Sequence, residues 1–392
     1  MITKIPKFEF MTIYPRTEKP MNMIKVSKKV LSLTMLVCLA WTATLAQNQE
    51  DIATFLNAGG KDASKLISAY IEPTVKSLSY GMTGNWYNTA ATHKTLGIDF
   101  GVSVNLAMIP TSDDYFNPNK LGLSVTTYDG ARDKDSSGPY DPTRKAPTFF
   151  GPKDETSYSA TYDPDGNGTL PSQTVSFSGP EGLAVKDKIG FAGIPVPVAQ
   201  LGIGIVKNTD LKLRFIPKVE AGQSSISMFG VGIQHDIKQH IRGIKLLPFD
   251  LSVLVAYNSL KGETDLSYTN VDPGDSRPGS TDGMGEYKFN SWVYQLLVSK
   301  RIAVLTVYGG VGYSMINTKV NINGTYTIQA TPDDFEVKDP VAMSIKNKSM
   351  RFTAGMRLKF GPIYLMGDYT LQKYKMINVG LGFSIRENKS VL

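Results

Sequence analysis

The stretch LGIDFGVSVNLAM, residues 96–108, alternates apolar side chains with polar or small ones without a break. The apolar set comprises Leu96, Ile98, Phe100, Val102, Val104, Leu106 and Met108. A period of two predicts a β-strand with one apolar face and one polar face. Water can cover the polar face, so the fold depends on what covers the apolar one.

The same alternation recurs along most of the chain. Several of the alternating segments run for 10 to 13 residues, whereas strands of soluble proteins usually have about 5 to 6. A tilted strand that crosses about 30 Å of hydrocarbon needs about 9 to 11 residues. Length therefore favours lipid as the cover. We expect strands at 96–108, 119–128, 199–206, 208–218, 225–235, 249–258, 287–299, 302–313, 349–360, 363–371 and 375–386, with one to three more inside 129–198.

The connections between these strands fall into two classes. Lys300-Arg301 and Gly361-Pro362 are tight turns, whereas 259–286 and 316–348 are long. Outer-membrane barrels have short periplasmic turns and long extracellular loops. Counting strands under that rule predicts an all-β protein, in which residues 94–392 form a transmembrane antiparallel β-barrel of 12 to 14 strands with a short N-terminal helical plug.

Residues 1–46 are expected to be removed from the mature protein. A basic stretch follows Met21 or Met23, then an apolar stretch and the small-residue site Thr44-Leu45-Ala46, which is the order of a secretory signal peptide. Residues 1–20 are interpreted as an upstream extension, with an extra cytoplasmic tail as the alternative. The sequence therefore predicts export to the outer membrane of a Gram-negative bacterium.

Removal of this stretch changes the composition of the chain. It holds seven basic and two acidic residues, so the net charge falls from +7 to +2 and gives no indication of nucleic acid as a partner. The single cysteine, Cys38, is also lost. The mature chain then has neither a disulfide nor a thiol nucleophile.

Residues 47–93 are expected to form the helical plug. Asp51 and Asp62 can each cap a helix, the first ending at Gly59-Gly60 and the second before Pro73. The second helix carries an apolar stripe that we interpret as a packing face, comprising Ala63, Leu66, Ile67, Tyr70 and Ile71.

Residues that would face the lumen or lie in the plug form the candidate ligand-binding set: Trp86, Tyr87, Asn88, His93, Asp99, Arg351 and Arg357. Both arginines lie opposite the apolar faces of their strands, as do Lys212, Arg214 and Lys359. One interpretation is a lining that attracts an anion. The simpler one is that these cations pair with carboxylates such as Asp99 and Asp368.

One loop imitates the start of a calcium-binding loop. Asp163, Asp165, Asn167 and Gly168 stand at positions 1, 3, 5 and 6, but position 12 is Thr174 rather than glutamate. A plain surface loop is the favoured interpretation and a weak calcium site is the alternative.

Other motifs of chemistry are absent from the sequence. The three histidines, His93, His235 and His240, complete no zinc pattern. No nucleophile elbow, P-loop or dinucleotide-binding motif is present. We expect no catalytic residues, no metal and no cofactor, and therefore no enzyme.

Five runs, at 85–100, 194–218, 230–253, 299–314 and 368–386, resemble an uncharacterised family of secreted Bacteroidetes proteins, known as a domain of unknown function. The resemblance covers nearly all of the mature chain. It implies an outer-membrane barrel and brings no established activity or catalytic residue.

The chain is more distantly similar to the outer-membrane long-chain fatty-acid transporters, in which an N-terminal segment plugs the lumen. Asn88-Thr89-Ala90 stands where those transporters often show Asn-Pro-Ala, and the proline is absent. The similarity implies a plug and a hydrophobic ligand.

These observations predict passive binding or transport of a small hydrophobic or amphipathic compound by a monomer embedded in outer-membrane lipid. The alternative is a structural or interaction barrel that presents loops 259–286 and 316–348 to a partner or a secretion complex. A third interpretation, a phospholipase-type enzyme, requires His93 or His240 beside a serine at the edge of the lumen or the membrane.

Overall fold

The computed structural model describes residues 54–162, 172–244, 246–267, 280–328 and 335–388. The expected signal peptide and the calcium-loop candidates Asp163, Asp165 and Asn167 lie outside these ranges. In the described part of the chain, no helix combines the length and the apolar character needed to cross a bilayer.

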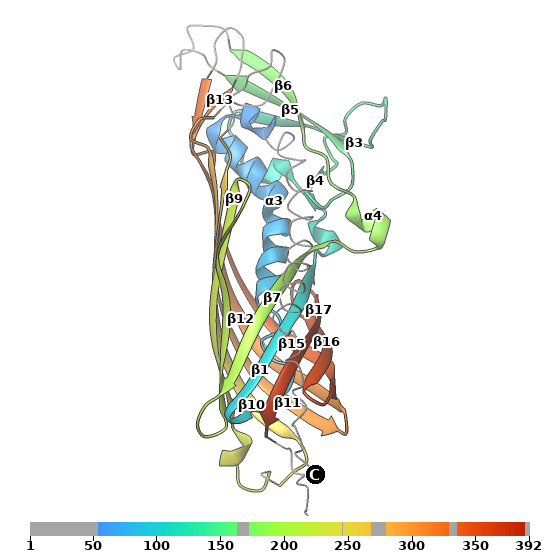
Figure 1. Cartoon of the computed structure of the whole chain (residues 1–392). Coiled ribbons are helices and arrows are strands. Elements are labelled where there is room, and N and C mark those ends of the chain that lie inside the picture. The colour runs from blue at the N-terminus through green and yellow to red at the C-terminus, as the bar shows by residue number, and fades with distance from the viewer. Residues whose placement is uncertain (1–53, 163–171, 245, 268–279, 329–334, 389–392) are drawn as a thin grey trace, which may run out of the picture. The chain divides into compact units, whose positions relative to one another are not determined.

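Ten strands close into an antiparallel barrel (Figure 1). The expected all-β barrel is therefore confirmed, but with ten strands where 12 to 14 were predicted. In spatial order the strands are β1 (His93–Met108), β17 (Met376–Glu387), β16 (Ile363–Leu371), β15 (Val341–Phe360), β12 (Leu305–Asn323), β11 (Met284–Ile302), β10 (Asp250–Asp265), β9 (Ser224–Asp236), β8 (Thr209–Ala221) and β7 (Gly193–Gly204).

The region between β1 and β7 accounts for the difference in strand number. β1 pairs directly with β7 from Ile98 to Met108, and the described residues of 109–192 add no strand to the wall. The strand predicted at 119–128 begins only at Thr126, because a 3-10 helix, η3 (Pro118–Lys120), precedes it. This excursion contains a sheet of β3 (Thr126–Arg132), β5 (Glu155–Tyr162) and β6 (Gln173–Gly179), a pair of β2 (Tyr115–Phe116) and β4 (Ala146–Pro147), η2 (Thr111–Asp113) and α4 (Val185–Ile189).

The two ends of the barrel differ in their connections. One end carries the tight turns from β11 to β12 and from β15 to β16, together with a 3-10 helix, η4 (Lys238–His240), between β9 and β10. We call it the short-turn end. The opposite end, the loop end, carries residues 109–192 and the connection from β12 to β15, which includes a strand pair, β13 (Thr325–Ile328) and β14 (Phe335–Lys338).

The apolar faces of the strands point away from the lumen. In β1, Leu96, Ile98 and Phe100 are exposed, whereas Asp99 and Asn105 are buried inside. In β15 the exposed positions are apolar from Met350 to Phe360 and change to Ser344, Lys346 and Lys348 toward the loop end. On the neighbouring strands Lys319 pairs with Ser344, and Lys288 pairs with Lys319, so the change occurs at matching register positions of β15, β12 and β11.

Toward the loop end, this outward apolar band gives way to lysines, and aromatic residues lie at the same edge. Trp292 in β11 stacks on Tyr294 and lies 5.0 Å from Tyr257 of β10 between ring centroids, at the band's edge. Aromatic girdles flanking an apolar belt are typical of barrels that cross a lipid bilayer. The fold is thus a transmembrane antiparallel barrel whose strands β10, β11, β12 and β15 continue beyond the belt.

The lumen is filled by the chain that precedes β1. A 3-10 helix, η1 (Thr54–Ala58), leads into α3 (Gly60–Met82), and residues 83–92 then run to the start of β1. Inside the wall, Ser77 Oγ donates to the carbonyl of Ala107 at 2.6 Å, and Ser79 Oγ lies 2.8 Å from Thr318 Oγ1. We call α3 together with residues 83–92 the plug (Figure 1).

Helix α3 is longer than the sequence predicted. We expected it to end before Pro73, but it continues through this residue to Met82. A proline inside a helix removes one backbone hydrogen bond and costs stability. Packing on the wall offsets that cost: Gly81 lies so close to β7 that a Cβ there would meet Val196 at 2.6 Å.

Candidate functional site in the lumen

The C-terminal end of α3 is held by side chains of the barrel wall. A helix leaves the carbonyls of its last turn without intrahelical donors. Here Asn105 Nδ2 donates to Gly81 O at 3.0 Å and Asn258 Nδ2 donates to Met82 O at 2.7 Å. The wall therefore completes the hydrogen bonding that the helix end lacks.

Two buried arginines complete this capture. Arg351 donates to Thr83 O at 3.1 Å, and Arg214 donates to Met82 O at 3.3 Å and to Gly84 O at 2.7 Å. Cations are favourable at the C-terminus of a helix, where the partial charge is negative. The predicted pairing of lumen cations with carboxylates does not apply to Arg214, for which the structure shows these carbonyls instead.

Trp86 lies directly on Arg214. The guanidinium carbon is 3.7 Å from the ring centroid, and both side chains are at most 1% exposed. Gln200 joins them, because its Oε1 accepts from Arg214 Nε at 3.0 Å and its Nε2 donates to the carbonyl of Trp86 at 3.2 Å. A buried arginine is stable only when its charge and donors are satisfied, and this arrangement provides both a π face and acceptors.

Tyr87 packs against the opposite side of the wall. Its hydroxyl accepts from Gln295 Nε2 at 3.1 Å, and its ring meets Tyr308 edge-on at 5.8 Å between centroids. Gly310 makes this position available, since a Cβ there would lie 2.3 Å from the Tyr87 hydroxyl. Asn88, the next residue, is also buried.

The last residues of the plug are held in the same way. Gln234 Nε2 donates to the carbonyl of Thr89 at 3.1 Å, and the amide of Ala90 donates to Ser299 Oγ at 2.9 Å. From Gly81 to Ala90, the plug thus contacts the wall through hydrogen bonds from several different strands. The polar lumen face predicted for water is covered by protein.

His93 fixes the point where the plug turns into β1. Its amide donates to Asp210 Oδ1 at 2.8 Å, its Nδ1 lies 2.8 Å from Asp210 Oδ2, and its Nε2 lies 2.9 Å from Ser384 Oγ. Ser384 Oγ donates to Glu387 Oε1 at 2.6 Å. The serine has one proton and the carboxylate can only accept, so toward His93 this hydroxyl is an acceptor.

This arrangement bears on the phospholipase interpretation, which required His93 or His240 beside a serine. His93 does lie beside Ser384, with Asp210 behind it. A serine nucleophile must give its proton to the histidine, however, and here Ser384 gives it to Glu387. His240 lies beside His235, with 3.0 Å between their Nε2 atoms. The geometry fits an anchor better than a nucleophile.

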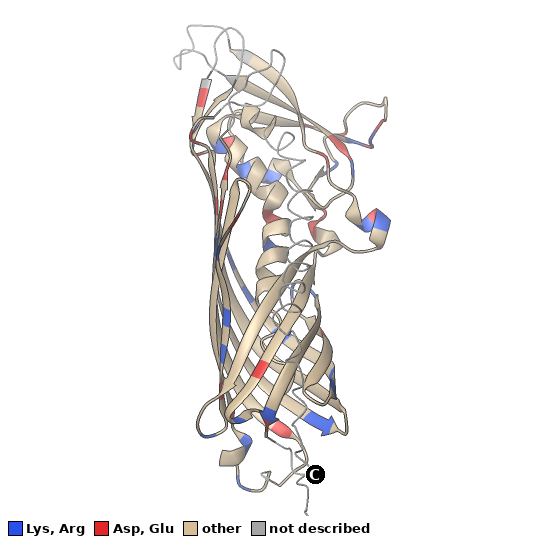
Figure 2. Ribbon diagram, in the orientation of Figure 1, with Lys and Arg blue, Asp and Glu red and all other residues tan. Residues whose placement is uncertain are grey.

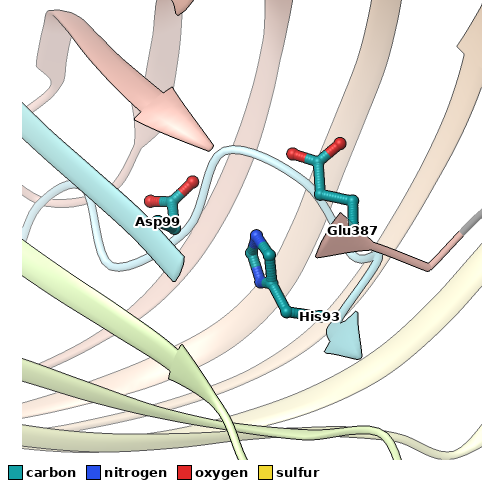
Figure 3. A group of neighbouring side chains, drawn as sticks. All are labelled: His93, Asp99 and Glu387. Atoms are coloured by element: carbon teal, nitrogen blue, oxygen red, sulfur yellow. The ribbon is translucent and has the colours of Figure 1, made fainter. Parts of the chain in front are cut away.

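Three side chains at the same place could hold a metal ion. His93, Asp99 and Glu387 point toward one another, and their ligand atoms lie within 4.8 Å (Figure 3). Two cations compete for this position: Arg357 lies 2.5 Å from Glu387 and 3.9 Å from Asp99, and Lys359 lies 2.9 Å from Glu387. A divalent ion would have to displace Arg357, so the arrangement is better described as an ion-pair network.

The candidate residues from the sequence form two groups in the structure. Trp86, Tyr87 and Arg351 gather at the end of α3, and His93, Asp99 and Arg357 gather at the short-turn end. Sequence reasoning missed their partners on the wall, which are Asn105, Gln200, Asp210, Gln234, Asn258, Ser384 and Glu387. Strand alternation marks most of these as inward-facing, but it does not show what they contact.

The family of the chain can be stated on its sequence. Residues 27–385 match the profile described as a family of unknown function, DUF6588. The chain therefore belongs to this family, in agreement with the resemblance to a domain of unknown function. No curated protein sequence matches the chain.

Solved structures with some likeness are outer-membrane proteins. The translocator domain of the autotransporter NalP from Neisseria meningitidis is 11% identical with a TM-score of 0.27, covering 81% of this chain and 96% of NalP. Ail from Yersinia pestis is 11% identical at 0.22, covering 45% and 93%. The protease OmpT from Escherichia coli is 9% identical at 0.23, covering 74% and 93%. Likeness at these scores supports no statement about function.

Proposed function

We propose that this member of the DUF6588 family is an outer-membrane barrel of a Gram-negative bacterium, kept closed by its own N-terminal plug, and that it works through the surface of its loop end. Export would follow cleavage after Ala46, the loop end would face outward, and the protein would act as a monomer in outer-membrane lipid. This places the interaction barrel, the second interpretation of the sequence, before passive transport.

One observation supports a closed lumen. Between Gly81 and Ala90, donors from the wall reach the plug at the carbonyls of Gly81, Met82, Thr83, Gly84, Trp86 and Thr89. Each of these bonds to a buried carbonyl contributes about 1 kcal/mol, and more where the donor is an arginine. Passage through the lumen would require many of them to break together.

The loop end has the packing expected of a surface that presents itself to a partner. The ring of Phe55 in η1 meets Tyr158 of β5 at 5.6 Å between centroids, and Tyr70 of α3 meets Phe149 at 5.9 Å. These contacts join η1 and the plug to the excursion between β1 and β7 in a single apolar core. A rigid platform keeps the geometry of its surface without a partner, which reduces the entropy lost on binding.

The closed state is tested by conductance in planar lipid bilayers. We expect the mature protein to show no steady current, and a variant lacking residues 54–92 to conduct. Because that deletion can prevent folding, the full-length double variant Arg214→Ala/Asn258→Ala serves as a second test and should show bursts of current. Steady current through the unmodified protein would overturn the proposal.

A second candidate is the binding or passage of a small hydrophobic or amphipathic compound when the plug moves. It is favoured by the polar nature of the plug's contacts: Trp86 Nε1, Gln234 Oε1 and Asn258 Oδ1 are buried without a hydrogen-bond partner. Water can take over such contacts at modest cost when the plug is displaced. A polar, imperfectly satisfied interface separates more easily than an apolar one.

A disulfide lock distinguishes the two candidates. Ser79 Oγ and Thr318 Oγ1 are 2.8 Å apart, and the only cysteine of the chain, Cys38, lies in the expected signal peptide. Ser79→Cys/Thr318→Cys should therefore join the plug to β12 when oxidised. The assay measures uptake of a fluorescent fatty acid by cells. Uptake that stops on oxidation and returns on reduction would support transport. No uptake in either state would favour the function of the loop end.

A further inference from the structure

An open pocket of about 550 Å³ lies at the short-turn end, beside the turn Gly361-Pro362. Its charged lining consists of Lys94, Arg301, Lys359, Arg386 and Glu387. Figure 2 shows lysine and arginine at this end of the barrel, near the C-terminal part of the chain. The pocket therefore has four cations and one carboxylate in its wall.

The carboxylate does not balance this charge. Glu387 already lies 2.9 Å from Lys359 and 3.9 Å from Arg301, and it also receives Arg357 at 2.5 Å from outside the pocket. Lys94 and Arg386 are exposed, and within the described ranges no carboxylate lies within 4.0 Å of either. Among the described residues, no further carboxylate neutralises the excess of positive charge in the pocket.

The backbone at the pocket is distorted on both paired strands. The register of β1 against β17 shifts between His93 and Ile98, so residues 94–97 bulge out of the ladder. Leu96 and Arg386 have backbone φ angles of 61° and 57°, values that residues other than glycine rarely adopt. Bulges re-aim side chains, and such strain is concentrated at functional sites. Here the distortion brings Lys94 and Arg386 to one pocket.

The surroundings of the pocket are apolar on the outside of the wall. Ile302, Phe360 and Ile363, at the two tight turns of this end, are 56–60% exposed. They belong to the edge of the apolar band that lies toward the short-turn end. A cationic recess at this level lies where the headgroups of a bilayer leaflet begin.

We propose that this pocket binds an anionic phosphate group. Guanidinium and ammonium groups together offer donors that match phosphate oxygens and supply the charge that the anion needs. The phosphate can belong to a phospholipid of the adjacent leaflet or to a soluble compound. The pocket shares Ser384 with the contacts of His93, where the plug turns into β1, so the proposal concerns the pocket with the plug in place.

Two variants with equal loss of charge test the site. Lys94→Gln/Arg386→Gln removes the two pocket cations that have no carboxylate partner among the described residues, and Arg242→Gln/Lys300→Gln removes two exposed cations of the same end that do not line the pocket. Each full-length protein is purified, exchanged into phosphatidylcholine with or without phosphatidylglycerol, and examined by native mass spectrometry for retained lipid. Thermal unfolding with sodium phosphate, against chloride at equal ionic strength, tests the soluble source.

We expect the unmodified protein and the control to retain phosphatidylglycerol selectively, and the pocket variant to bind it about 25-fold more weakly, since each of the two cations near a lipid surface changes affinity about fivefold. Stabilisation by phosphate alone, lost in the pocket variant, would assign the site to a soluble phosphate instead. Equal loss in both variants, or no preference for either phosphate source in the unmodified protein, would overturn the proposal.

Discussion

The guanidinium of Arg214 lies 3.7 Å from the centre of the Trp86 ring. Arg214 belongs to β8 and Trp86 to the plug, so one contact joins the wall to the chain inside it. The same guanidinium holds the end of α3 through the carbonyls of Met82 and Gly84. Arg214 therefore holds the plug at both the end of α3 and Trp86.

Replacement of Arg214 should therefore loosen the plug. Arg214→Met leaves the buried carbonyl of Gly84 and Gln200 Oε1 without their arginine donor, while Met82 O keeps Asn258. We expect a loss of about 3 kcal/mol in the free energy of unfolding. Arg214→Lys should lose less, because it keeps the charge but not the planar fork that meets Trp86 and Gln200 together. Denaturant titration in detergent measures both, with the exposed Arg242→Met as control. A loss in the control as large as in Arg214→Met would contradict this role.

The close approach of Tyr87 to Gly310 gives a second prediction. Gly310→Ala would place a Cβ 2.3 Å from the Tyr87 hydroxyl, and overpacking of this kind typically costs about 1 to 3 kcal/mol. Adding Tyr87→Phe to the same chain should recover part of the loss, because it removes the clashing oxygen. Gly367→Ala, where the nearest atom is 3.6 Å away, is the control. Thermal unfolding compares the unmodified protein, Gly310→Ala, the double variant and Gly367→Ala. If Tyr87→Phe restores no stability, the contact with the Tyr87 hydroxyl is not the cause of the loss.

Asp62, near the start of α3, predicts a dependence on pH. Its carboxylate accepts from the amides of Ser124, Val125 and Thr126 at 2.8 to 3.0 Å. Burial raises the pKa of this carboxyl, but the three amides and the Ser124 hydroxyl outweigh it and hold the pKa below its ordinary value of 3.8. A lowered pKa in the folded state means stability that is present above the ordinary value and lost as the pH falls through the folded one.

The melting temperature of the unmodified protein should therefore exceed that of Asp62→Asn by a constant amount at neutral and mildly acidic pH. The difference should shrink below about pH 4, where the carboxyl takes up its proton first in the unfolded state, and level off below the lowered folded-state pKa, where the carboxyl is neutral in both states. Asp135→Asn, on an exposed turn, should show no such difference. A gap between Asp62→Asn and the unmodified protein that widens on acidification would contradict the assignment.

The position of the lipid band predicts the cost of a charge. Leu296 points outward within the apolar band of β11, whereas Ser344 points outward from β15 on the loop-end side of it. Leu296→Arg should cost about 2 to 4 kcal/mol and Ser344→Arg less than about 1 kcal/mol, because arginine is destabilising near the bilayer midplane and tolerated at its edge. Reversible unfolding from lipid vesicles measures both. Equal costs would mean that the band does not lie in hydrocarbon.

Much of the wall could be predicted from the sequence because strand alternation is local. Residues 96–108 and 349–360 show by themselves which side chains face outward, and β16 has the predicted bounds. The number of strands could not be predicted in this way. It depends on the pairing of β1 with β7, whose residues are separated by the whole excursion 109–192, and no local pattern encodes that contact.

The candidate site was predictable in composition but not in arrangement. Trp86, Arg351 and Arg357 were expected in the lumen on residue type and strand face, and they lie there. Their partners depend on where α3 ends, and Pro73 wrongly suggested an earlier end. The sequence therefore showed cations in the lumen without showing that two of them cap a helix.

The closing seam of the barrel has a consequence for biogenesis. It joins β1 to β17, the first and last wall strands, and the plug immediately precedes β1 along the chain. Pairing between such distant segments forms late, because the entropy of closing a long loop must first be overcome. The plug can thus settle against the open sheet before the last strand arrives, and zipping of the seam then encloses it. A circular permutant with the plug after β17 would face a finished cylinder and would have to thread it.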